Sequence, residues 1–481
     1  MIPTDLLIPL MFAVLFVFLL SGFPVAFALA ANGLLFGYLA IEQGLMNSAL
    51  LQAIPERIFG IMSNDTMLAI PFFTFMGLVL ERSGMAEDLL ETAGKLFGRV
   101  RGGLAYAVIL VGALLAATTG VIAASVISMG LISLPVMLKY GYSPRIATGV
   151  IAASGTLAQI IPPSLVLIVM ADQLGVSVGD MYAGAMLPSL TLVALYLAYV
   201  FVVSRIKKDA LPPLPDLGHT SALQTISTVL LVLIPPLLLI FLVLGTIFLG
   251  VATPTEGGAM GAVGALVLAA AKRRLSLAVL KQALEATTKL SSFVLFILIG
   301  STVFSLTFRA IGGDLWVEQL MTNLPGGQIG FLVAVQLLIF VLGCFLDFFE
   351  IAFIAIPLLA PVAHKLGIDP IWFGVMIGVN LQTSFLTPPF GFALFYLKSV
   401  TPPEVKTGDI YKGILPFILI QIAMVVLIYL FPQFIQGQQK QVYKDTPLQL
   451  DLPLNGGYQD PYSNPSQGTV PFVPKFSQPN Q

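Results

Sequence analysis

Charged residues, cysteine and histidine are all scarce in this chain of 481 residues. Only 10% of the residues are charged, against roughly 25% in an ordinary soluble domain. The formal net charge of −1 leaves no basic excess of the kind that nucleic-acid binding requires. A single cysteine, Cys344, excludes a disulfide framework or a thiolate metal cluster, and two distant histidines, His219 and His364, do not form an imidazole site. The composition therefore excludes an ordinary soluble enzyme and a nucleic-acid-binding protein.

Hydrophobic residues make up 57% of the chain and are gathered into uncharged runs of 24 to 39 residues. A bilayer core is about 30 Å thick, so that roughly 20 helical residues cross it. We therefore predict an all-α polytopic membrane protein. The first segment is expected to remain as a helix, because the start MIPTDLL lacks the basic residues of a signal peptide.

The length of each run predicts its number of membrane passes. In the first half we expect two passes within 6–41, one at 66–82, an amphipathic surface stretch at 87–101, a long run at 102–138, an interrupted segment at 146–171 and a pass at 184–204. In the second half we expect passes at 226–249 and 257–271, a surface stretch at 275–290, a pass at 291–309, a long run at 326–363, an interrupted segment at 371–397 and a pass at 413–434. The two long runs favour re-entrant hairpins.

The two halves are related by a shift of 226 positions that aligns eight identical residues. The aligned pairs are Pro135 with Pro361, Val136 with Val362, Lys139 with Lys365, Gly141 with Gly367, Pro144 with Pro370, Ile151 with Ile377, and Pro162-Pro163 with Pro388-Pro389. An internal duplication is the simplest interpretation. The predicted organisation is a first repeat at 1–206, a linker at 207–222, a second repeat at 223–435 and a disordered polar tail at 436–481.

The distribution of Lys and Arg predicts the orientation, because cytoplasmic loops carry an excess of both. With residue 1 outside, 17 of the 23 basic residues fall inside, and Arg57, Arg309, Lys365 and the basic residues of the tail fall outside. Lys139 then lies inside while Lys365, its counterpart, lies outside. We therefore expect two inverted repeats, each with a re-entrant hairpin and a helix broken at Pro-Pro, as is typical of secondary transporters.

The helix breaks and the middles of the hairpins are the candidate functional positions. A helix broken at bilayer depth exposes backbone carbonyl and amide groups, which need an ion, a substrate or water as partner. Hydroxyl, amide and carbonyl oxygens suit sodium, and helix N-termini at the same breaks can face a carboxylate. The candidates for binding the ion or substrate are Thr118, Thr119, Gly120, Ser154, Gly155, Thr156, Pro162, Asp347, Asn380, Gln382, Thr383, Thr387 and Pro388.

Other interpretations of these features compete. One Pro-Pro pair is often only a kink, but two pairs at the same register, each after a hairpin-length run, favour a site. Asp347 either shapes the site or only caps the hairpin tip. A stand-alone sodium:dicarboxylate symporter is a second transporter hypothesis. An intramembrane hydrolase using Asp347 or Glu350 is a distant one, because the chain offers no clear acid pair or Ser/His pair.

Four segments resemble a known family. Over essentially residues 1–435 the chain resembles the large membrane (M) subunit of the tripartite ATP-independent periplasmic (TRAP) transporters. The segments are AATTGVIAASVISMGLISLPVMLKYGY (116–142), ASGTLAQIIPPS (153–164), ATPTEGGA (252–259) and GVNLQTSFLTPPFGFALFYLK (378–398). The resemblance implies a sodium-coupled, elevator-type importer of organic acids, not an enzyme, in the bacterial inner membrane.

The same resemblance implies partners and sites. The expected partners are a small four-helix membrane subunit, as a separate chain, and a periplasmic substrate-binding protein, together with a carboxylate substrate and membrane lipid; no cofactor besides the coupling sodium ion is expected. The N-terminus and the tail are expected on the periplasmic side. The family's ion sites lie at the hairpin tips and broken helices, which here are residues 118–120, 154–156 with Pro162, Asp347, and 380–383 with Thr387.

The inverted topology can be tested by labelling from each side of the membrane. In a Cys344→Ala background, we expect single cysteines introduced by Lys139→Cys and Lys365→Cys to react with an impermeant thiol reagent from opposite sides. Labelling of both positions from the same side would contradict the inverted repeats.

Overall fold

The computed structural model describes residues 4–97, 100–214, 222–388 and 391–436. Within these ranges the regular structure is helical. The first half contains α1 (Thr4–Leu20), α2 (Val25–Glu42), α3 (Ala49–Gln52), α4 (Ile54–Met62), α5 (Asp65–Arg82), α6 (Met85–Phe97), α7 (Gly103–Thr119), α8 (Ile122–Lys139), α9 (Pro144–Thr156), η1 (Leu157–Gln159), α10 (Leu165–Leu174) and α11 (Val178–Ile206).

The second half follows a short 3-10 helix, η2 (Lys208–Ala210), in the predicted linker. It contains α12 (Ala222–Phe248), α13 (Pro254–Ala271), α14 (Leu277–Ala310), α15 (Gly313–Thr322), α16 (Gln328–Leu342), α17 (Phe348–Ile354), α18 (Ile356–Lys365), α19 (Pro370–Leu386), α20 (Phe392–Ser399), α21 (Thr407–Leu430) and α22 (Gln433–Gln436). The expected disordered tail from residue 437 onward lies outside the described residues.

Six helices in the described part are long and apolar enough to cross a membrane, or up to eight if each of two bent pairs is one span. Their outer faces are apolar: on α12, Leu231 is 72% exposed and Phe241 is 75% exposed. Side chains of this kind are stable on a surface only where lipid covers them. The prediction of an all-helical polytopic membrane protein is therefore confirmed.

Both expected helix breaks are present. In the first, α9 ends at Thr156, one 3-10 turn follows, and α10 begins at Leu165 after Pro162 and Pro163, whose peptide bond is cis. In the second, α19 ends at Leu386 and α20 begins at Phe392. Proline has no N–H to donate to a helix, and Pro162, Pro163 and Pro388 all lie in these interruptions, although Pro235 and Pro236 lie within α12.

Two hairpins precede these breaks. In the first, α7 and α8 pack against each other and are joined at Gly120, whose φ of +59° lies in the left-handed region that glycine adopts without strain. The second hairpin has α16 as its first arm. Its other arm is divided into α17 and α18, which meet at 51°. Pro357, near the start of α18, lacks the N–H that would continue the preceding helix.

Some expected boundaries are wrong. The surface stretch at 275–290 and the pass at 291–309 form one helix, α14, of 34 residues. The reason is local: residues 277–310 contain no proline and only one glycine, so nothing ends the helix. The short helices α3, α4 and α15 were not predicted, because their sequences are too short or too mixed in polarity for a membrane pass.

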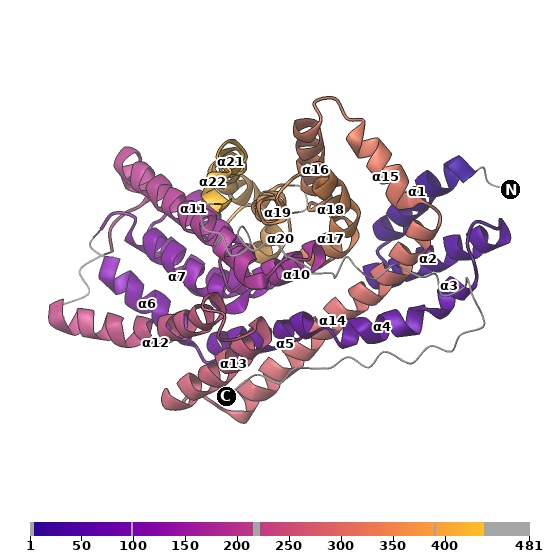
Figure 1. The fold of residues 1–481 in the computed structure, drawn as a ribbon. Helices are drawn as coiled ribbons and strands as arrows, with labels where there is room; N and C mark the ends of the chain where they lie inside the picture. Colours follow the sequence, from indigo (N-terminus) through magenta and orange to yellow (C-terminus); the bar gives the residue numbers. More distant parts are fainter. Residues whose placement is uncertain (1–3, 98–99, 215–221, 389–390, 437–481) are drawn as a thin grey trace, which may run out of the picture. The chain divides into compact units, whose positions relative to one another are not determined.

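The two halves pack crosswise. Helix α14 runs beside α2, α4 and α5, and α13 packs on α5 (Figure 1). The backbones of α2 and α14 approach so closely that a Cβ on Gly300 would lie 2.2 Å from the carbonyl oxygen of Ala26. Thr307 of α14 also donates a 2.8 Å hydrogen bond to the carbonyl of Gly33. The second long helix of each half is thus packed against the third long helix of the other half.

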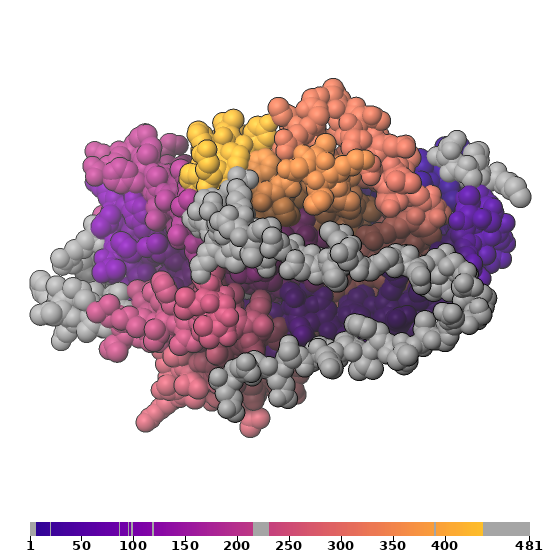
Figure 2. Space-filling view, in the orientation of Figure 1, coloured from indigo at the N-terminus to yellow at the C-terminus, as the bar shows by residue number. Residues whose placement is uncertain are grey.

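The hairpins and broken helices form their own packed group. Helix α10 packs on α17 and α18, and α20 packs on α8, so that each broken helix contacts the hairpin of the other half. Helix α21 packs on α9 and α19; its side chains (yellow) lie beside the orange region of α16 to α19 in Figure 2. This arrangement brings the hairpin tips and breaks of both halves together.

The contact between α9 and α21 gives a stability prediction. A Cβ on Gly413 would lie 2.0 Å from the carbonyl oxygen of Arg145, so we expect Gly413→Ala to cost about 1–3 kcal/mol and lower the melting temperature of the purified protein. Gly408, in the first turn of the same helix, has nothing within 4 Å of the added Cβ. Gly408→Ala is therefore the control and should leave the melting temperature unchanged or raise it. Equal effects of both substitutions would contradict the close packing.

Candidate functional site

The tips of both hairpins and both helix breaks line one cavity of about 60 Å³. The lining comes from the two hairpins, the two breaks and α14. The residues are Gly120, Val121, Ile122 and Ala123 of the first hairpin, Gln159 and Val166 of the first break, Asp347, Phe348 and Phe349 of the second hairpin, Phe385, Phe392 and Tyr396 of the second break, and Leu290 of α14. Of the predicted site residues, Gly120 and Asp347 thus face this cavity.

Four helices begin at the cavity: α8, α10, α17 and α20 each contribute residues of their first turn to its lining. The N-cap residues of α8, α10 and α20 are Val121, Ser164 and Gly391, and none of them makes a side-chain cap hydrogen bond. The first N–H groups of a helix have no partner within the helix and carry a partial positive charge. The three uncapped N-termini can therefore donate to a negatively charged group, and the carboxylate of Asp347 at the fourth also lines the cavity.

Asp347 and Glu350 form a capping box at the start of α17. The Asp347 carboxylate accepts from the N–H of Phe348, and the Glu350 carboxylate accepts a 2.8 Å hydrogen bond from the N–H of Asp347. The sequence left open whether Asp347 caps the hairpin tip or shapes the site. It caps the helix and also lines the cavity.

Gln159 was not among the predicted site residues, although it is a notable polar group of the cavity. Its side chain is fully buried, and neither its amide nitrogen nor its amide oxygen has a hydrogen-bond partner. A buried amide without a partner is costly, and a ligand that supplies the missing hydrogen bonds would offset that cost. The signal in the sequence was its position between Thr156 and Pro162, inside the first break.

The remaining candidates of the first break are buried beside the cavity. Ser154 has a hydroxyl without a hydrogen-bond partner, and Thr156 donates a 2.9 Å bond to the carbonyl of Ala153 in its own helix. Gly155 lies against Val126 of α8, where an added Cβ would be 2.3 Å from that side chain. Thr118 and Thr119 end α7, but their side chains lie outside the described residues.

The candidates of the second break form a polar layer around α19. Asn380 donates a 2.7 Å hydrogen bond to the carbonyl of Gln336, and Thr387 donates one of 2.7 Å to the carbonyl of Thr383. Gln382 is directed toward α21, where its oxygen lies 3.5 Å from the amide nitrogen of Gln421, and its own amide nitrogen has no partner. Pro388 is half-buried where α19 ends. These candidates therefore lie near the break, and none of them lines the cavity.

Membrane helices that break and meet at a buried cavity are typical of secondary transporters. Residues 12–434 match the model of the family described as tripartite ATP-independent periplasmic transporter, DctM component. The chain belongs to this family, as the resemblance predicted, and is a multi-pass membrane protein. Because the family consists of transporter permeases, the prediction that the chain is not an enzyme is confirmed.

Similar proteins include two named permeases and one solved structure. The C4-dicarboxylate TRAP transporter large permease protein DctM of Pseudomonas aeruginosa is 31% identical over 78% of this chain and 86% of its own. The sialic acid TRAP transporter large permease protein SiaM of Vibrio cholerae is 29% identical over 86% of this chain and 94% of its own. The YdaH transporter of Alcanivorax borkumensis, 16% identical, shares the fold with a TM-score of 0.57 over 82% of this chain and 91% of its own.

The capping role of Asp347 gives a testable prediction. Asp347→Ala removes the N-cap of α17 and should cost about 0.5–2 kcal/mol, which lowers the melting temperature of the purified protein. Asp347→Asn keeps an oxygen that can accept from the N–H of Phe348, so its melting temperature should stay close to that of the wild type. An equal loss in both variants would show that the negative charge, and not the cap, stabilises the hairpin tip.

Proposed function

We propose that this chain is the large permease subunit of a sodium-coupled TRAP importer of organic acids. The observation that carries the proposal is the cavity at which hairpin tips and helix breaks of both halves meet, in a chain that belongs to the TRAP family. The substrate would pass the membrane there by alternating access.

A carboxylate is the chemical group that fits the cavity. Three helices begin there without a side-chain cap, so their free N–H groups can donate to carboxylate oxygens. The relatives described above are named for C4-dicarboxylates and for sialic acid, which share this group. Which acid this chain carries would depend on the cavity's apolar residues and on the soluble partner.

Sodium is the coupling ion that the breaks favour. The candidate ligands are neutral oxygens in the helices that end at the breaks, such as the hydroxyl of Ser154 in α9, the amide of Asn380 in α19 and the hydroxyl of Thr387, the C-cap residue of α19. No group of three or more His, Cys, Asp or Glu residues is gathered for a metal ion in the described ranges. A hard monovalent ion with oxygen ligands is consistent with both observations.

The inverted repeats and the elevator mechanism are part of the proposal. The crosswise packing of α2 on α14 and of α13 on α5 supports two related halves, and it would form a fixed frame. The hairpins, broken helices, α11 and α21 would move as one group against that frame. The predicted orientation, with the N-terminus and tail outside, would place the outward opening on the side of Arg57 and Arg309.

Two partners complete the proposed system. A small membrane subunit and a periplasmic substrate-binding protein correspond to the other two parts of the tripartite family. Helix α13 of the frame offers apolar surface for the small subunit: Val263 and Val267 are 61% and 60% exposed. The binding protein would deliver the acid to the outer side.

Reconstitution tests the proposal. We expect proteoliposomes with all three components to take up their acid only with an inward sodium gradient, and proteoliposomes with this chain alone to take up none. We expect Asn380→Ala, Thr387→Ala and Ser154→Ala to raise the sodium concentration for half-maximal uptake, because each removes the oxygen of a candidate ligand. Ser399→Ala is the control, since this exposed hydroxyl on α20 only donates to Tyr396 in its own helix.

Two outcomes would contradict the proposal. Sodium-driven uptake by this chain alone would favour the stand-alone symporter instead. Sodium should also raise the melting temperature of the purified chain more than potassium does, because an ion that binds only the folded state stabilises it. Equal protection by both ions, with a wild-type sodium response in all three variants, would mean that the breaks are hinges and not ion sites.

A further inference from the structure

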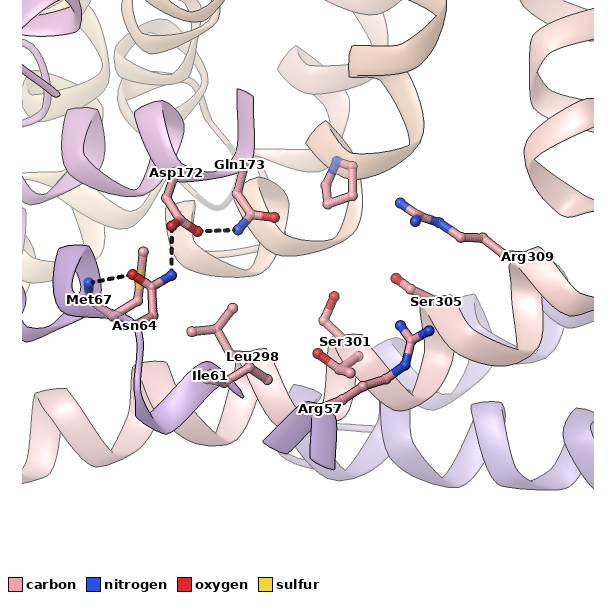
Figure 3. A pocket seen from close by; sticks show the side chains of 12 residues that line it. Arg57, Ile61, Asn64, Met67, Asp172, Gln173, Leu298, Ser301, Ser305 and Arg309 are labelled. Carbon is pink, nitrogen blue, oxygen red and sulfur yellow. Dashed lines mark hydrogen bonds between the residues drawn. The ribbon is translucent and has the colours of Figure 1, made fainter. Parts of the chain in front are cut away.

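A second cavity, of about 230 Å³, lies between α4, α10, α14 and α18 (Figure 3). Its lining is unusually polar for a membrane protein. One side carries Asn64, Asp172 and Gln173, and the other carries Arg57, Arg309 and Ser305. The sequence did not predict a site here. Of these residues it drew attention only to Arg57 and Arg309, as basic residues expected on the outer side of the membrane.

The acidic group of this cavity already has partners. One carboxylate oxygen of Asp172 accepts a 2.8 Å hydrogen bond from the amide of Asn64, and the other accepts a 2.9 Å bond from the amide of Gln173. The oxygen of Asn64 in turn accepts from the N–H groups of Thr66 and Met67, as the N-cap of α5. Asp172 is thus held at one side of the cavity.

The arginines have no such partners. Within the described part of the chain, the side chains of Arg57 and Arg309 form no ion pair or hydrogen bond, and both residues are exposed. Figure 3 shows their guanidinium groups on the side of the cavity where Ser305 lies, away from Asp172. Two positive charges in a pocket with a hydroxyl beside them attract an anion, and the planar guanidinium fork matches a carboxylate.

Two helices, α10 and α14, contribute residues to the lining of both cavities. Val166 of α10 lines the central cavity and Asp172 lines the second one, so the two positions are about 9 Å apart along the helix. On α14, Leu290 and Ser301 line the two cavities and are about 16 Å apart along the axis. Both helices therefore run from the second cavity to the cavity at the helix breaks, and α14 also carries Arg309.

We propose that Arg57, Arg309 and Ser305 form an outer binding site for the carboxylate of an organic acid, occupied before the acid reaches the central cavity. The order of the two sites rests on the function and orientation proposed above. The binding of a carboxylate at the arginines does not depend on transport. The same carboxylate chemistry could be supplied by an acidic side chain of a partner protein, and the test separates these sources.

The electrostatic part is tested by thiol labelling of the purified chain. The variant carries Ser305→Cys in a Cys344→Ala background. We compare the rate of labelling by the anionic reagent 2-sulfonatoethyl methanethiosulfonate with the rate for its cationic trimethylammonium analogue. The ratio of the anionic to the cationic rate should be higher at position 305 than for a free thiol in solution. Replacing both arginines by Arg57→Gln and Arg309→Gln should lower this ratio by about tenfold, because a charged cleft concentrates ions of opposite sign. Arg205→Gln removes an exposed arginine of α11 outside this cavity and is the matched control.

The ligand part uses the acids for which the relatives are named. Succinate or N-acetylneuraminate at millimolar concentration should slow labelling at position 305, and succinamide, which lacks the charge, should not. The protection should disappear in the double glutamine variant and be partly kept by Arg57→Lys with Arg309→Lys, which also shows that the cavity still folds.

Three results would overturn the inference: an unchanged reagent ratio in the double glutamine variant, protection that persists there, or protection by neither acid. The last result would leave an acidic side chain of a partner as the source of the carboxylate. Because labelling needs no transport, failed uptake in the reconstituted system would contradict the proposed function and leave this site intact.

Discussion

Backbone hydrogen bonding at membrane depth is the constraint on which the rest of this structure depends. Each broken helix leaves N–H and C=O groups that lipid cannot satisfy. The structure gathers these groups in one place and satisfies part of them internally. Ser164 donates to the carbonyl of Gln159 across the first break, Thr387 donates to that of Thr383 at the second, and Asp347 caps α17. The side-chain amide of Gln159, which has no hydrogen-bond partner, faces the cavity.

Close packing of unbroken helices supplies the frame that such a cavity needs. Gly300 at the crossing of α2 and α14 has no side chain, and this allows the two backbones to approach closely. Small residues at crossings are the usual means of association in lipid, where burial of apolar surface contributes little. The helix breaks are thus accompanied by continuous helices that are closely packed elsewhere in the same structure.

The two cavities also differ in the charges that line them. Two arginines without side-chain partners and Asp172 line the second cavity, while the central cavity carries the partial charges of helix N-termini and the carboxylate of Asp347. A full charge is cheaper to keep near water than at the centre of the bilayer, where helix dipoles can attract an anion without a desolvated side chain. A carboxylate moving inward would thus exchange two guanidinium groups for backbone N–H groups.

The sequence by itself determined the helical membrane class, the positions of both Pro-Pro breaks and the tip of the first hairpin, because hydrophobic run length and proline act locally. It also placed Gly120 and Asp347 at the hairpin tips, where both line the central cavity. It could not predict that Gln159 faces that cavity while Gln382 is directed toward Gln421. Arg57 and Arg309 are 252 positions apart in the chain, and only the packing of α4 against α14 brings them to the same cavity. Such contacts depend on helix rotation and crossing geometry, which neighbouring residues in the sequence do not fix.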